Sequence, residues 1–189
     1  MASLDIVRGG SGSVAGHYRC GGTLISPTTV LTAAHCLETS EANPLTAITV
    51  LLGWGNLNDY FYGAAAEPGA EAIPASHWKQ NEAFNAKTVA NDIGLIFLSA
   101  PSRYSPAALD LTGALGLPGL GTLALGFGST LAVSGSSSSD IPPQLPNVLY
   151  VVEIPVVDNS FCNIEWTSKY FNPAMQAGPH FIRPSPRLT

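Results

Sequence analysis

Cys20-Gly-Gly-Thr-Leu-Ile-Ser-Pro-Thr-Thr-Val-Leu-Thr-Ala-Ala-His35-Cys36 is the most informative stretch of this sequence. It contains two apolar runs joined by a Ser-Pro turn, which predicts a β-hairpin. Because a hairpin brings its ends together, we expect a Cys20–Cys36 disulfide, worth about 3 kcal/mol for a loop of this size. That bond would also fix His35 at the end of a strand. Taken by itself, a histidine beside a cysteine is more often structural than catalytic.

Further apolar runs of strand length flank this hairpin on both sides. They are rich in Val, Ile and Leu and are bounded by Gly, Pro, Asn or Ser. Apolar residues make up 46% of the chain and charged residues only 11%, with 19 Gly and 15 Pro. This composition suits short strands joined by many turns, so the sequence predicts an all-β protein. The expected strands are 22–25, 30–33, 48–52, 93–98, 122–125 and 148–157.

Three segments between these runs are expected to be loops or boundaries. Residues 55–91 are polar and contain Gly, Ala and Pro, so we expect mostly surface loop with one short strand near 72–73. Residues 134–140, Ser-Gly-Ser-Ser-Ser-Ser-Asp, are expected to form a flexible exposed loop. Sequence rich in Pro, Ser and Gly at 101–118 separates two groups of strands, which places a boundary between two sub-barrels there.

Charge and composition argue against nucleic acid and membranes as partners. The formal net charge is −5 and the eight Lys and Arg are scattered singly, so no basic stripe is present. Residues 111–139 hold no charged side chain, but Gly and Pro interrupt them too often for a membrane-spanning helix. The first eight residues include an acid and a base and no long apolar run, so we expect no signal peptide in this chain.

Two motifs together identify a family resemblance. Thr32-Ala-Ala-His-Cys36, preceded by Cys-Gly-Gly-Thr-Leu-Ile, resembles the catalytic-histidine motif of the chymotrypsin/trypsin family of serine proteases. Asn91-Asp-Ile-Gly-Leu-Ile-Phe-Leu98 resembles the stretch that supplies the family's aspartate, although Gly94 stands where Ala is usual. By itself Asp92 would be interpreted as a turn residue that caps a loop. The order of His before Asp is that of chymotrypsin.

The resemblance extends along most of the chain and implies a fold. Gly126-Phe-Gly128 resembles the family's Gly-Trp-Gly strand end, and residues 155–162 resemble the strand and cysteine that follow. The resemblance covers residues 2–178 and implies two antiparallel Greek-key β-barrels. The first barrel would occupy residues 1–105, and an incomplete second barrel residues 118–178. Residues 179–189 have no strand pattern and resemble an unrelated tail.

The resemblance also implies an activity and a location. The family members are endopeptidases, so His35 would be the general base that takes the proton of a serine hydroxyl, and Asp92 would orient it. Protein or peptide substrates or inhibitors would be the partners, and oligomeric state stays open. The family and the disulfide together imply a secreted protein.

No cofactor or metal is expected. The three remaining histidines are spaced too irregularly for a metal site, and three acids in the long loop are weak support for calcium. The three histidines are His17, His77 and His180, and the three acids are Asp59, Glu67 and Glu71.

Several family features are not found in the sequence. No Gly-Asp-Ser-Gly-Gly stretch occurs, so the nucleophilic serine is absent and we expect the chain as given to be inactive. Gln176 stands where a partner of Cys162 would be expected. A truncated or mis-spliced protease is the favoured interpretation. The alternative is a non-catalytic homologue or splice form that acts as a binding protein.

The N-terminal residues resemble the family's activation terminus only superficially. Ile6-Val-Arg-Gly-Gly10 differs from Ile-Val-Gly-Gly because Arg8 is inserted. Only nine residues separate Gly10 from Cys20, too few for the strand that the family places there. We therefore expect residues 2–8 and 16–20 to form a hairpin that leads into the histidine strand.

Overall fold

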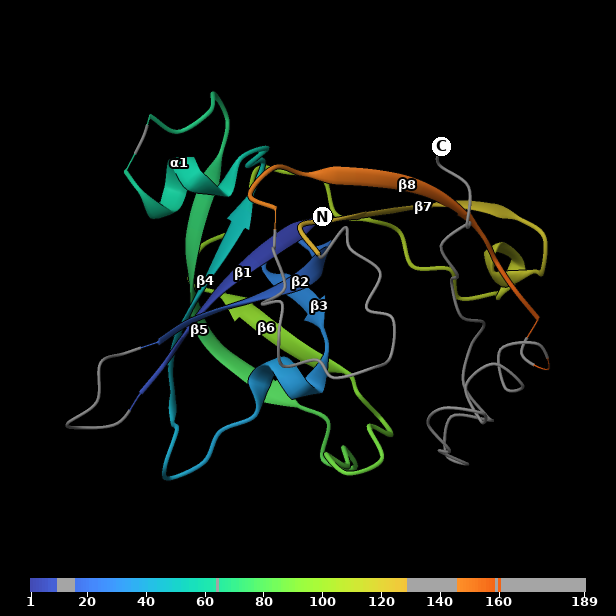
Figure 1. Cartoon of the computed structure of the whole chain (residues 1–189), viewed down its shortest axis with the longest axis horizontal. Helices are drawn as coiled ribbons and strands as arrows, with labels where there is room; N and C mark the ends of the chain where they lie inside the picture. Colours follow the sequence, from blue (N-terminus) through green and yellow to red (C-terminus); the bar gives the residue numbers. More distant parts are fainter. Residues whose placement is uncertain (10–15, 64, 129–145, 159, 161–189) are drawn as a thin grey trace, which may run out of the picture.

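Six antiparallel strands close into a barrel that contains most of the hydrophobic core. The computed structural model describes residues 1–9, 16–63, 65–128, 146–158 and 160. The barrel order is β1-β2-β3-β6-β5-β4, and each neighbouring pair is antiparallel (Figure 1). The strands are β1 (Ala2–Arg8), β2 (Gly16–Ser26), β3 (Thr29–Thr32), β4 (Leu45–Leu52), β5 (Glu71–Gln80) and β6 (Gly94–Leu98).

Strand alternation explains why these segments close around one core. Side chains two residues apart lie on the same face of a strand. In β1 the inward series is Ala2, Leu4 and Ile6, all of which are at most 1% exposed. Val30 and Ile96 meet this series from β3 and β6 and are fully buried. The apolar runs that predicted strands therefore supply the inner wall of the barrel.

The predicted hairpin of residues 2–8 and 16–20 is confirmed. β1 pairs with β2 from Ala2 opposite Gly22 to Arg8 opposite Gly16. Gly22 is required here, because a Cβ atom would lie 2.7 Å from Val30 Cγ1 and 3.2 Å from a backbone oxygen. Ile6 and Val7 therefore belong to a paired strand, as expected for a hairpin that leads into the histidine strand.

The prediction for residues 55–91 is wrong in part. This segment contains the short helix α1 (Leu57–Phe61), begun by the Asn56 side chain, and the ten-residue strand β5 rather than one short strand. The alternation of β5 is interrupted by Pro74 and by a register shift between Ala75 and His77. These interruptions hide from the sequence pattern a strand whose inward side chains pack against the core.

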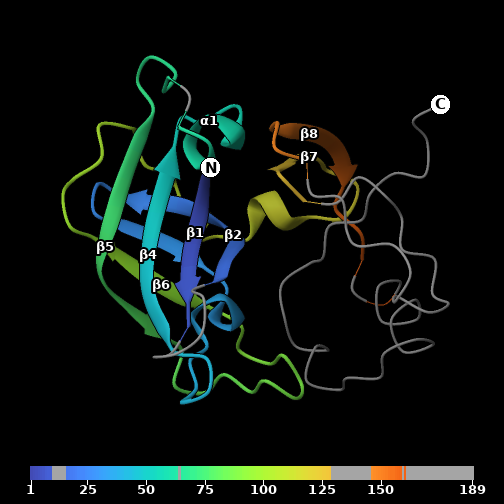
Figure 2. The ribbon, with the colours of Figure 1, turned by 60° about the vertical axis from the view of Figure 1, so that its left-hand side comes forward.

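A second, two-stranded sheet lies beside the barrel (Figures 1 and 2). Its strands are β7 (Gly121–Gly126) and β8 (Tyr150–Pro155), as the sequence predicted for this region. The chain before β8 is attached to the barrel, because Arg19 Nη1 donates to Asn147 Oδ1 at 2.8 Å and Leu57 N donates to Asn147 O at 2.7 Å. The linker between the barrel and this sheet comprises residues 99–120 and contains the short 3-10 helix η2 (Ala114–Gly116).

Several expectations fall outside the described residues. The predicted loop at 134–140, Cys162, Gln176, His180 and the tail at 179–189 all belong to this part of the chain. Among the helices that the structure does describe, none combines the length and the apolar character needed to cross a membrane.

Candidate active site

His35 and Asp92 meet at the ends of two paired strands. His35 lies in the 3-10 turn η1 (Ala34–Leu37), which begins two residues after β3 ends. Asp92 lies two residues before β6 begins. Since β3 and β6 are neighbours, with Thr32 opposite Gly94, barrel closure brings together two residues that are 57 positions apart.

The Asp92 carboxylate contacts both the ring and the backbone of His35. Asp92 Oδ2 lies 2.7 Å from His35 Nδ1, and Asp92 Oδ1 accepts the His35 backbone N–H at 2.8 Å. The imidazole is 55% exposed, whereas the Asp92 side chain is 20% exposed. One oxygen therefore orients the ring while the other fixes the turn that carries it.

Asn91 shapes the loop that presents Asp92. Its φ of 57° lies in the left-handed region, which Asn tolerates better than most residues. Its side chain donates to Ala83 O at 2.9 Å, and Ile93 N donates to Asn91 O at 2.8 Å. The Asn-Asp pair in the motif thus combines a turn residue with the carboxylate that the turn presents.

The predicted disulfide is confirmed. Cys20 and Cys36 are bonded, with their Cα atoms 6.3 Å apart, and Cys36 is 4% exposed. His35 Nε2 lies 3.4 Å from Cys36 Sγ. Cys20, His35 and Cys36 bring their donor atoms within 4.8 Å of one another, the spacing of a metal site. The disulfide nevertheless uses both sulfurs, so neither is a thiolate ligand.

Gly94, the departure from the family's usual Ala, has a local reason. A Cβ at this position would lie 2.5 Å from Leu37 Cδ1 and 3.4 Å from Lys79 O. Leu37 is 2% exposed and belongs to the turn that carries His35. The missing side chain therefore lets this turn pack directly against β6.

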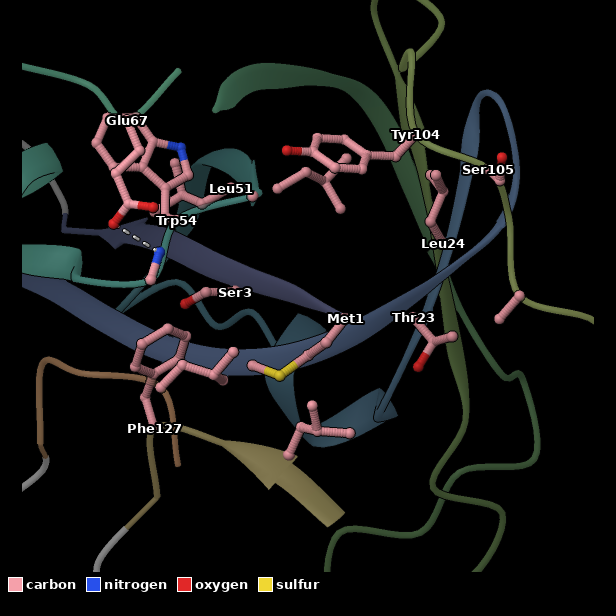
Figure 3. A pocket seen from close by; sticks show the side chains of 16 residues that line it. Met1, Ser3, Thr23, Leu24, Leu51, Trp54, Glu67, Tyr104, Ser105 and Phe127 are labelled. Carbon is pink, nitrogen blue, oxygen red and sulfur yellow. Dashed lines mark hydrogen bonds between the residues drawn. The ribbon is translucent and has the colours of Figure 1, made fainter. Parts of the chain in front are cut away.

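An open cleft adjoins Asp92, and His35 is not among the residues that line it. Its volume is about 680 Å³, and Asp92 and Ala33 line it together with residues 19–23 of β2 and with residues 125–128 at and just after the end of β7. A second hollow of about 440 Å³ lies between the barrel end and the same part of β7. Figure 3 shows Trp54, Met1 and Phe127 around that hollow, while Glu67 accepts the Gly55 N–H at 3.2 Å.

Glu67, Glu71 and His77, three of the other titratable residues named from the sequence, have structural partners. Glu71 accepts bonds from Ser102 Oγ at 2.6 Å and Arg103 Nε at 2.7 Å, and Glu67 accepts the Gly55 N–H. His77 stacks on Phe97 with ring centroids 4.3 Å apart.

A second His–Asp contact was missed by the sequence analysis. His17 Nδ1 lies 2.8 Å from Asp5 Oδ1, and the Tyr60 hydroxyl donates to Asp5 Oδ2 at 3.1 Å. Burial raises the pKa of Tyr60, a Thr49 hydrogen bond opposes this, and the Asp5 charge adds to the rise. The only sequence signal was an acid between the apolar residues Leu4 and Ile6, and the structure buries this acid, with Asp5 3% exposed.

Comparison with known proteins identifies relatives among serine proteases. The chain is 30% identical over 147 residues to brachyurin of Leptuca pugilator, which covers 77% of this chain and 57% of the relative. It is 31% identical to cationic trypsin-3 of Rattus norvegicus, covering 82% of this chain and 55% of the relative. Trypsin of Sarcophaga bullata is 33% identical, and the match covers 76% of this chain and 50% of the relative. The chain thus spans about half the length of the curated relatives it matches.

A solved structure shares the fold. The structure titled HL collagenase superposes with a TM-score of 0.63 and 22% sequence identity, covering 92% of this chain and 63% of that one. The family model described as Trypsin matches residues 1–182. A closed six-stranded barrel beside a partial second sheet is the arrangement that this family implies. On these grounds the chain belongs to the trypsin family of chymotrypsin-like serine proteases.

Proposed function

We propose that this chain carries the base and the orienting acid of a serine endopeptidase, with His35 as the general base and Asp92 as the residue that orients it. The two-point contact between Asp92 and His35 carries this proposal. A carboxylate at Nδ1 favours the tautomer in which Nε2 is unprotonated and can accept a proton. The same carboxylate would stabilise the imidazolium that forms when the proton arrives.

The reaction follows from that arrangement. A serine hydroxyl is a weak nucleophile at neutral pH, so His35 Nε2 would remove its proton as the oxygen attacks the peptide carbonyl. The protonated imidazole would then give the proton to the leaving amine. The cleft beside Asp92 offers room for a peptide. Peptide or protein substrates and secretion are part of this proposal, supported by the family and the disulfide.

This sequence contains no Gly-Asp-Ser-Gly-Gly stretch, the motif that carries the nucleophilic serine in the family. We expect the 189-residue chain to show no turnover of peptide esters and no labelling by a fluorophosphonate. Stoichiometric labelling would reject the claim that the nucleophile is absent. The transcript read beyond the codon for Gly178 is the complementary test, in which a frame encoding Gly-Asp-Ser-Gly-Gly supports the endopeptidase.

The roles of the two residues are tested in a product that has the serine. His35→Ala and Asp92→Asn should each lower kcat by about 10⁴-fold, the size of loss known for Ser-His-Asp triads. His77→Ala is the matched control, because its ring stacks on Phe97 and contacts Ser76 Oγ rather than Asp92. Equal activity in the wild type and His35→Ala would reject the proposal.

A non-catalytic binding role is the second candidate, and one observation favours it. Leu123, Leu125 and Val151 share one face of the second sheet and are 50–64% exposed. Exposed apolar surface of this kind commonly marks a contact site. If this role is correct, a partner captured by the wild-type chain should bind His35→Ala equally well and Leu123→Ser more weakly.

A further inference from the structure

Arg8, the residue inserted in the Ile-Val-Gly-Gly-like sequence, contacts the turn that carries His35. Its Nη2 donates to Cys36 O at 2.9 Å, and its Nη1 donates to Glu38 O. Its guanidinium also lies over the Tyr18 ring, 5.7 Å from the centroid. One planar cation therefore joins two carbonyl groups at the end of η1, a geometry suited to Arg rather than Lys.

The barrel explains how Arg8 reaches this turn. Arg8 continues the inward series of β1 at the end of the strand, after Ala2, Leu4 and Ile6. The register against β4 shifts between Val7 and Arg8, so the regular pairing with β4 ends at this point. Both Arg8 hydrogen bonds are partly buried, so the two carbonyls would lose a donor where water replaces it incompletely.

Arg8 completes a set of contacts that hold η1 from several strands. Gln80 Nε2, on β5, donates to Ala34 O at 2.9 Å. The disulfide fixes Cys36 to β2, and Asp92 accepts the His35 N–H. Without Arg8, the end of the turn after His35 keeps its disulfide, but the carbonyls of Cys36 and Glu38 lose their cationic donor.

We propose that Arg8 is a positioning residue for His35: its guanidinium, bound to the carbonyl oxygens of Cys36 and Glu38, holds η1 so that His35 Nδ1 faces the Asp92 carboxylate. The part of this inference that concerns catalysis rests on the proposed function. The contact between Arg8 and η1, and its effect on the orientation of His35, can be tested without any hydrolysis. Arg8 acts through the backbone of the turn and contacts no reacting atom.

The test is NMR of the full chain, with the wild type compared with Arg8→Met, Arg8→Lys and the control Arg19→Met. Arg19, on β2, is also a barrel arginine with an aromatic contact, 4.7 Å from the centroid of the Phe61 ring, but it binds Asn147 instead of η1. Two readouts report on His35: the imidazole nitrogen shifts, which give the tautomer, and hydrogen exchange of its backbone N–H.

In the wild type and Arg19→Met we expect the Nδ1–H tautomer and a protected His35 N–H. Arg8→Met should give a mixture of tautomers and His35 N–H exchange at least about tenfold faster, since two bonds to a charged donor are lost. Arg8→Lys should resemble Arg8→Met, because an ammonium cannot span two carbonyls in one plane.

Several results would overturn the inference. Arg8→Met with wild-type tautomer and exchange rejects it, as does an equal change in Arg19→Met. Wild-type behaviour in Arg8→Lys rejects the two-carbonyl contact, and unfolding of both Arg8 variants shows a general stabilising role instead. A wild-type chain in which His35 lacks the Nδ1–H tautomer rejects the proposed role of His35, whereas exchange of its N–H still tests Arg8.

Discussion

A single carboxylate connects the chemistry and the local fold at the level of residues. Asp92 contacts Nδ1 of the His35 ring through one oxygen and accepts the His35 backbone N–H through the other. Both contacts require an acceptor, and a carboxylate offers acceptors on both oxygens whereas an amide offers only one. Asp92 therefore serves the folded structure as well as the proposed catalysis.

Asp92→Asn should expose this double role. The amide can satisfy one of the two His35 donors, and its NH₂ group would face the other. We expect the free energy of unfolding to fall by about 1–3 kcal/mol and the His35 tautomer to shift toward Nε2–H. Chemical denaturation and imidazole NMR measure these effects. Asp59→Asn, in the first turn of α1, is the control, and an equal loss there would show that the effect is not specific to His35.

Close packing between η1 and β6 is the corresponding feature at the level of elements. Gly94 leaves space that Leu37 Cδ1 fills, which places the histidine turn against the strand that follows Asp92. The substitution that looked like a mild departure in the sequence is therefore matched by a buried leucine. Neither residue alone reveals this pairing.

Gly94→Ala should destabilise the barrel by about 1–3 kcal/mol, because the added methyl group overlaps a packed side chain. Leu37→Ala should also be destabilising, since it removes a buried side chain. In the double variant the added methyl group occupies the space left by the leucine. The loss of stability in the double variant should therefore be smaller than the sum of the losses in the two single variants. A double-mutant cycle by urea denaturation measures the coupling, and strictly additive losses would contradict direct packing.

The sequence predicted elements well where alternation is regular. The strands around residues 22–33 and 93–98 were found because apolar residues and turn residues follow one another without interruption. β5 was missed because Pro74 and the shift near His77 break its pattern, and its strand character comes from pairing with β4 and β6. His35 and Asp92 were found through motifs. The Arg8 contact was not, because it depends on barrel closure.

Burial divides the whole molecule into two unequal parts. The barrel buries Leu4, Ile6, Val30 and Ile96 almost completely, whereas β7 and β8 leave large apolar side chains exposed. The linker between these parts is joined to the barrel by Glu71, which is 8% exposed and binds Ser102 and Arg103. Because Glu71 is a buried carboxylate, we expect acid to weaken the attachment of the linker to the barrel.

The direction of that sensitivity follows from the pKa of Glu71. Burial raises this pKa, but the hydrogen bonds from Arg103 and Ser102 outweigh burial, so it lies below the ordinary value. A lowered pKa means that the folded state favours the carboxylate. Its stabilising contribution is therefore complete above the unfolded pKa, about 4.3, and is lost as the pH falls through the folded value.

Glu71→Gln should remove this contribution. At pH 7 the variant should be less stable than the wild type by about 1–3 kcal/mol, and the difference should shrink once the pH falls below about 4. Asp110 also titrates in acid, since bonds from Thr112 and the Leu115 N–H lower its pKa to about 2. Asp110→Asn therefore serves as a comparison on the exposed linker. Urea midpoints measured from pH 7 to pH 2 decide the matter, and a Glu71→Gln difference that stays constant over this range would contradict the assignment.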